Sequence, residues 1–103
     1  DEEIAYLRQT RDWLVEELPQ RIPGLKTSKP DATYLLWLDF ADTAIGGNPQ
    51  PAKWLRENAK VALNEGDTFG TGGPGHARLN FSTSREILEE ALDRMERAFA
   101  ALD

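Results

Sequence analysis

The side chain with the most specific chemical potential in this sequence is Arg78. It stands between Ala77 and Leu79 in a segment, residues 77–81, whose alternation of polar and apolar residues predicts a strand. A guanidinium within a sheet needs a partner or access to water, and its planar fork suits a carboxylate held by two hydrogen bonds. The residues alone leave two interpretations open. Arg78 forms a structural ion pair with an internal acid such as Asp39, or it binds a ligand's carboxylate.

The glycine-rich stretch at residues 68–76 ends in the sequence's one histidine, His76. No second histidine and no helical carboxylate stand at metal-ligand spacing, so we expect no metal site and interpret His76 as a solvated loop residue. The stretch also lacks the Lys-Ser/Thr of a phosphate-binding loop, and it leads into a strand where such a loop would open a helix. A flexible hairpin connection accounts for it better.

Composition narrows the function classes. The chain has 103 residues, enough for one domain, with a net charge of −6 and no cysteine. The negative charge disfavours nucleic acid, the longest apolar runs are too short for a bilayer, and disulfide and thiolate metal sites are excluded. The acidic start, Asp1-Glu2-Glu3, is unlike a signal peptide, and cytoplasmic residence fits. Because no initiator Met is present, we expect that the chain begins inside a longer one or was cut.

Six elements follow from the pattern. A helix is expected from about Glu2 to Leu18, near Pro19, with Ile4, Leu7, Leu14 and Leu18 on one stripe and Tyr6 and Trp13 as a possible second stripe. Further expected elements are a strand at 32–40 covered on both faces, a helix capped by Asn48 with Pro49 first, a short strand at 61–63, a strand at 77–81, and a last helix opened by a Thr83–Glu86 capping box. This order of elements, helix, strand, helix, strand, strand and helix, predicts one two-layer α+β domain over residues 1–103. Its small sheet is expected to be mostly antiparallel.

The last helix carries its acids, including Glu90, Asp93 and Glu96, among arginines such as Arg94. We interpret this face as solvated, with ion pairs between residues three or four positions apart.

Three segments in order carry a family resemblance: TYLLWLDF at 33–40, AKVALNEGDTFG at 59–70 and GHARLNFSTSREILEEALDRM at 75–95. They resemble the C-terminal small domain of class I/II aminotransferases of fold type I, in the branch of MalY/PatB-type cystathionine beta-lyases. The resemblance covers nearly the whole chain, and is strongest from about Pro30 onward.

The resemblance implies a set of roles. Arg78 matches the arginine that binds the substrate's α-carboxylate, Tyr34 and Trp37 lie on the strand that borders the active site, and Asn80 is structural. The full-length enzyme would use pyridoxal 5'-phosphate (PLP), act on an amino acid and form a homodimer. Its cofactor lysine lies in the large domain, which this segment lacks, so this chain alone is expected to hold no catalytic or cofactor-binding residue and to be inactive.

Two alternatives stay open at this point. The reaction could be transamination by the same family instead of C–S lysis. In a different class, the chain could be a free-standing α+β ligand-binding or regulatory module. An upstream large domain with a cofactor lysine would support the enzyme, and its absence would favour the free-standing module.

Overall fold

Two paired strands at the centre of one sheet position the side chains of interest. The computed structural model describes residues 2–28, 35–65 and 75–102. Its elements are α1 (Glu2–Arg21), β1 (Lys26–Ser28), β2 (Leu35–Asp39), α2 (Pro51–Asn58), β3 (Asn64–Glu65), β4 (His76–Asn80) and α3 (Arg85–Ala100). The strands form an antiparallel sheet in the order β1-β2-β4-β3, and the predicted α+β architecture is confirmed. No helix in the described part of the chain is long and apolar enough to span a membrane.

The sheet is covered by helices on one face. Along β2, Leu36 and Leu38 are fully buried, whereas Leu35, Trp37 and Asp39 are half-exposed. The prediction that this apolar strand is covered on both faces is therefore wrong. Because successive side chains of a strand point to opposite faces, only every second residue reaches the core, even in a run that is almost continuously apolar.

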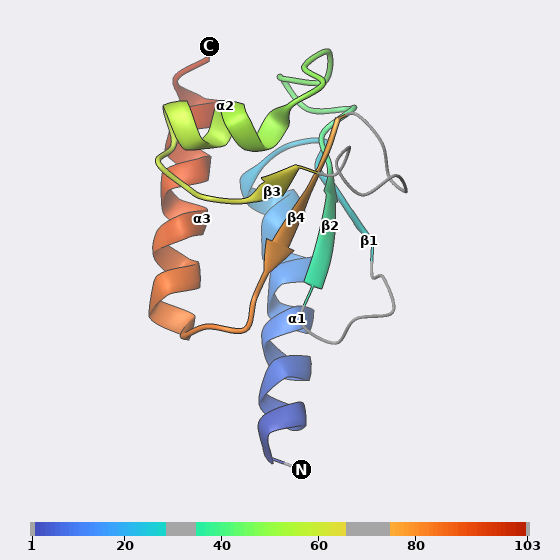
Figure 1. Cartoon of the computed structure of the whole chain (residues 1–103), viewed down its shortest axis with the longest axis vertical. Helices are drawn as coiled ribbons and strands as arrows, with labels where there is room; N and C mark the ends of the chain where they lie inside the picture. The colour runs from blue at the N-terminus through green and yellow to red at the C-terminus, as the bar shows by residue number, and fades with distance from the viewer. Residues whose placement is uncertain (1, 29–34, 66–74, 103) are drawn as a thin grey trace.

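The core lies between the sheet and the helices α1 and α3 (Figure 1), with residues from every layer: Leu14, Leu18, Leu36, Leu38, Phe40, Ala77, Leu79, Phe81, Leu88, Leu92, Met95 and Phe99. The α1 stripe is confirmed at Leu14 and Leu18. Trp13, from the alternative stripe, is half-buried under the Arg85 guanidinium of α3, which lies 4.1 Å from the ring centroid. Tyr6 is 44% exposed. Figure 1 shows α1 extending past the sheet toward the N-terminus, with the two termini at opposite ends.

Helix α1 is longer than the sequence predicted, which placed its end at about Leu18. The helix continues through Pro19 to Arg21, and the Ile22 N–H still donates to the Leu18 carbonyl at 2.9 Å. Ile22 is buried, so its packing favours the extra turn despite the hydrogen bond that proline removes. Gly24 then turns the chain at φ +89°, where a Cβ would collide with the Asp42 carbonyl. The predicted stop at Pro23-Gly24 is thus confirmed.

The predicted caps of α2 and α3 are displaced. The Asn48 side chain accepts the Gln50 N–H at 2.8 Å and makes a turn ahead of α2, which begins only at Pro51. In α3 the N-cap is Ser84, whose hydroxyl oxygen accepts the Ile87 N–H at 3.3 Å, and not Thr83. Both residues can cap a helix, and Ser is the better N-cap of the two, so intrinsic preference favours the observed cap at Ser84.

The short strand expected at 61–63 lies instead at Asn64–Glu65. Lys60 adopts φ 59° and ends the α2 region, and the Val61 N–H donates back to the Leu55 carbonyl. Val61 is buried, so its apolar character serves the core in a connecting segment and does not mark a strand.

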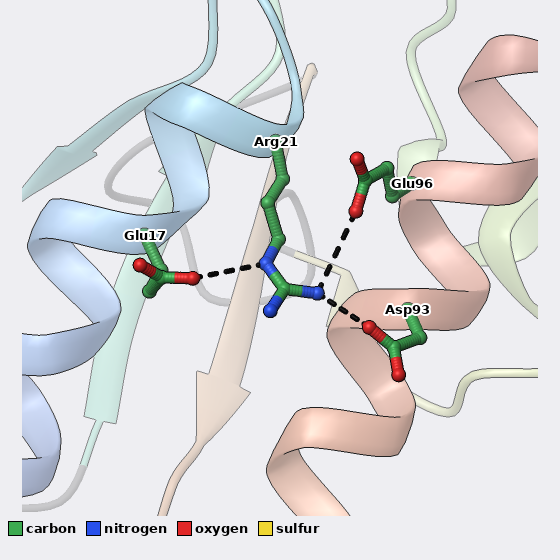
Figure 2. Close-up of polar contacts among 4 residues, drawn as sticks. All are labelled: Glu17, Arg21, Asp93 and Glu96. Atoms are coloured by element: carbon green, nitrogen blue, oxygen red, sulfur yellow. Dashed lines mark hydrogen bonds and ion pairs between the residues drawn. The ribbon is translucent and has the colours of Figure 1, made fainter.

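A charged cluster joins α1 to α3 (Figure 2). The Arg21 guanidinium lies 3.1 Å from Glu17, 2.6 Å from Asp93 and 3.6 Å from Glu96. The hydrogen bond to Asp93 is the main cause that raises the pKa of Arg21. We call these four residues the Arg21 cluster. The acids of the last helix are exposed, as predicted, and Arg94 pairs with Glu90 within the helix at 3.0 Å. Asp93 and Glu96 instead pair with Arg21 of α1.

Candidate functional site

The face of the sheet that turns away from the helices carries the candidate site. Trp37 and Asp39 of β2 and His76 and Arg78 of β4 alternate with the buried residues of their strands, and all four are half-buried. Residues paired across an antiparallel ladder lie on the same face. The register pairs Trp37 with Arg78 and Asp39 with His76, so the four side chains form one group, which we call the open face.

Arg78 occupies the middle of the open face. Its strand β4 lies between β2 and β3, and its register partners are Trp37 on one side and Asn64 on the other. The structure therefore brings together two of the three residues singled out for substrate binding. Tyr34, the third, lies outside the described residues, as do Gly66, Phe69 and Gly70 of the matched segments.

Asp39 and His76 form the other half of the group. The Asp39 Oδ1 atom accepts the Ala41 N–H at 2.9 Å, while Oδ2 lies 3.6 Å from His76 Nε2. The His76 ring meets the Trp37 indole edge-on, with centroids 6.4 Å apart. The expectation of a solvated loop histidine is wrong, because His76 is the first residue of β4 and only 27% of its side chain is exposed.

The β2–β4 register shows where Arg78 lies relative to Asp39, the acid considered as its ion-pair partner. The residue opposite Asp39 is His76, and Arg78 lies two register pairs further along the ladder, opposite Trp37. Sequence reasoning missed the Asp39–His76 contact. Two signals could have found it: His76 precedes Arg78 by two positions, hence shares its face, and Asp39 is the one charge in an apolar strand.

Asn80, at the end of β4, accepts the Ser82 N–H through its side-chain oxygen at 2.9 Å. This bond fixes the turn after the strand, in agreement with a structural role. Within the described ranges, no group of three or more His, Cys, Asp or Glu side chains could hold a metal ion.

Comparison with known proteins adds to this geometry. The chain is 50% identical over 95 residues to cystathionine beta-lyase of Corynebacterium glutamicum, covering 92% of the chain and 24% of that protein. It is 34% identical over 100 residues to cystathionine beta-lyase PatB of Bacillus subtilis, covering 97% and 26%. A crystal structure from Corynebacterium diphtheriae, assigned as a PLP-dependent beta-cystathionase, superposes with a TM-score of 0.87 at 52% identity, covering 96% and 26%.

The chain is homologous to the C-terminal segment of PLP-dependent beta-cystathionases and aminotransferases. It spans about a quarter of the length of these relatives. No family model matches the chain.

The three lysines among the described residues lie on the surface. Lys26 is exposed and pairs with Asp42 at 2.7 Å, and this hydrogen bond raises the pKa of Lys26. Lys60 donates to the Glu57 carbonyl on the surface, and Lys53 is exposed on α2. A lysine that forms a Schiff base is commonly activated by a desolvated pocket, and these three lysines are exposed to solvent.

Proposed function

We propose that this chain is the C-terminal domain, residues 1–103, of a PLP-dependent C–S lyase related to cystathionine beta-lyase, and that Arg78 binds the α-carboxylate of its sulfur amino-acid substrate. The observation that carries the proposal is the place of Arg78. It is a half-buried arginine opposite Trp37 on the sheet face that turns away from the helices, in a segment 50% identical to a cystathionine beta-lyase.

The chemistry follows from what a guanidinium offers. Its planar fork can bind both carboxylate oxygens, and partial burial strengthens the attraction relative to open water. Fixing the carboxylate orients the bonds at Cα, which lowers the entropic part of the barrier. The indole of Trp37 excludes water from one side, and Tyr34 is proposed to border the same site. When bound in the full-length enzyme, PLP supplies the electron sink for the reaction at Cα.

The remaining parts of the enzyme are proposed to lie elsewhere. The domain would face its own large domain, which holds the cofactor, within a cytoplasmic homodimer. On its own, the chain would neither bind PLP specifically nor turn over amino acids, because the described lysines occupy surface positions.

An aminotransferase of the same family is the second candidate. The chain is 39% identical over 90 residues to the probable aspartate/prephenate aminotransferase of Aquifex aeolicus, covering 85% of the chain and 22% of that protein. Arg78 would have the same role in both reactions. Incubating the full-length protein with L-cystathionine separates them: pyruvate and a released thiol indicate the lyase, and absence of both products with conversion of an added keto acid indicates transamination. The gene upstream of residue 1 tests the free-standing module, because a cofactor-lysine domain there would exclude it.

Arg78→Ala in the full-length protein tests the proposed role directly. Removing one partner of a charged hydrogen-bonded pair costs about 2–4 kcal/mol, so kcat/KM for the amino-acid substrate should fall by roughly 30- to 1000-fold. Arg78→Lys keeps the charge but loses the fork, and should recover only part of the loss. Arg56→Ala, on the exposed side of α2, is the matched control and should leave kcat/KM unchanged. Unchanged kcat/KM in Arg78→Ala would refute the assignment.

A further inference from the structure

The connection from α2 to β3 is held to α3 by an arginine that has no role in the function proposed so far. Arg94 of α3 donates through Nη1 to the Lys60 carbonyl at 3.2 Å, and its Nη2 atom lies 3.0 Å from Glu90 Oε1, one turn earlier in the same helix. Figure 1 shows the connection running past α3 before it enters β3. Glu90 thus orients the Arg94 side chain, and Arg94 ties the connection to the last helix.

Lys60 turns the chain within this connection. It adopts φ 59°, the left-handed region that residues other than glycine rarely occupy, so the contacts around it must maintain its conformation. The Val61 N–H donates to the Leu55 carbonyl at 3.4 Å, which ties the residue after the turn to α2. Arg94 supplies the partner of the Lys60 carbonyl from α3. The two hydrogen bonds therefore hold the turn between two helices.

The Lys60 turn leads directly to the strand beside Arg78. Val61 is buried and Leu63 packs partly against the core, so the segment after Lys60 is anchored as it approaches the sheet. β3 follows at once, and its register pairs Asn64 with Arg78 of β4. β3 has two residues, and a strand this short contributes few ladder bonds of its own. Its position next to Arg78 therefore depends on the connection that leads into it.

Resting on the proposed function, we infer that Arg94 is a positioning residue for the substrate-binding Arg78. Arg94 acts without touching substrate. It holds the Lys60 turn, the turn sets the place of β3, and β3 supports the strand on which Arg78 lies. Because Arg94 is 42% exposed, solvent screens its charge, and its contribution comes from the directed hydrogen bond to the Lys60 carbonyl. Loss of this bond lets β3 shift and weakens the binding of the α-carboxylate at Arg78.

A double-variant cycle in the full-length PLP enzyme, with L-cystathionine as substrate, tests this link. Arg94→Met keeps an unbranched side chain but removes the donors, and should lower kcat/KM by about 3- to 10-fold, the scale of one ordinary hydrogen bond. In an Arg78→Ala background the same substitution should change kcat/KM by less than about 2-fold, because the interaction that Arg94 supports is already absent. Arg97→Met, at an exposed position on the same helix, is the matched control and should leave kcat/KM unchanged.

Two further variants test whether the effect passes through the Lys60 turn. Arg94→Lys keeps a donor near the Lys60 carbonyl and should recover part of the loss. Lys60→Gly in the Arg94→Met enzyme should also recover part of it, because glycine adopts φ 59° without steric cost. A merely structural contribution of Arg94 would lower the Tm without this dependence on Arg78.

The outcomes separate this inference from the proposed function. Equal losses from Arg94→Met with and without Arg78, or no loss in either background, overturn the role of Arg94 while the lyase stands. A loss that Lys60→Gly does not reduce overturns the route through the Lys60 turn. Wild-type enzyme that releases no pyruvate from L-cystathionine, or unchanged kcat/KM in Arg78→Ala, overturns the proposed function and this inference together. A loss that requires Arg78 and is reduced by Lys60→Gly supports the inference.

Discussion

The Arg21 cluster offers a prediction about stability that depends on tertiary structure. Arg21 contacts one acid on its own helix and two on α3, so Arg21→Met removes every one of these contacts while keeping an unbranched side chain. The guanidinium is 22% exposed, but Asp93 and Glu96 are 58% and 51% exposed. Solvent therefore screens the cluster, and each pair belongs on the scale of surface ion pairs, about 0.2–1 kcal/mol.

Three pairs near the middle of that scale give a cost of about 1–2 kcal/mol for Arg21→Met. Leaving Glu17, Asp93 and Glu96 near one another without a cation adds to the cost. For a domain of this size the change corresponds to a fall in Tm of roughly 5–15 °C. Arg11→Met is the matched control, because Arg11 pairs only with its neighbour Asp12 within α1, at 3.3 Å, and it should cost less than about 0.5 kcal/mol.

The free energy of unfolding is measured by chemical denaturation for the wild type, the Arg21→Met and Asp93→Asn single variants, and their double variant. The double-variant cycle should give a coupling between Arg21 and Asp93 that shrinks in 1 M salt. A folded-state pKa raised above the unfolded value stabilises the protein below the unfolded pKa, and this contribution is lost as pH rises through the folded pKa. Since the pKa of Arg21 is raised, its own titration should cause no loss of stability near neutral pH. If Arg21→Met lowers the free energy of unfolding by no more than Arg11→Met does, the reasoning is refuted.

Three further outcomes are expected. Leu38→Ala, at a fully buried position between sheet and helices, should destabilise the chain by about 2–5 kcal/mol in urea denaturation, whereas Leu102→Ala, at a 46% exposed position, should cost less than about 0.5 kcal/mol. Ser84→Ala should cost about 0.5–2 kcal/mol, and Thr83→Ala clearly less; equal costs would contradict the observed cap. The 103-residue chain mixed with one equivalent of PLP should show no stoichiometric visible band from a lysine adduct, and such a band would contradict the proposal that the cofactor lysine lies outside this chain.

The sequence alone predicts the existence and type of the main elements well. The strands around Leu36–Leu38 and Ala77–Phe81 and the long last helix have strong periodic or apolar patterns, and tertiary contacts only trim their ends. Element boundaries are less determined. Thr83 and Ser84 can both cap α3, with Ser the better N-cap, whereas Pro19 is tolerated because Ile22 packs into the core beyond it. The tolerance of Pro19 depends on packing energies that local propensity does not contain.

The open face likewise has features that the sequence predicts and features that only the packing of the chain decides. The sequence by itself determined that Arg78 lies on a strand beside apolar neighbours, and the family resemblance indicated a carboxylate partner for it. Only the tertiary structure decided which residues share its surroundings, because the β2–β4 register sets Trp37 opposite Arg78 and Asp39 opposite His76. A shift of one residue would turn each of these side chains toward the core. Strand register arises from the packing of Leu36, Leu38 and Leu79 against helices distant in sequence, and for that reason the chain's local pattern could not disclose it.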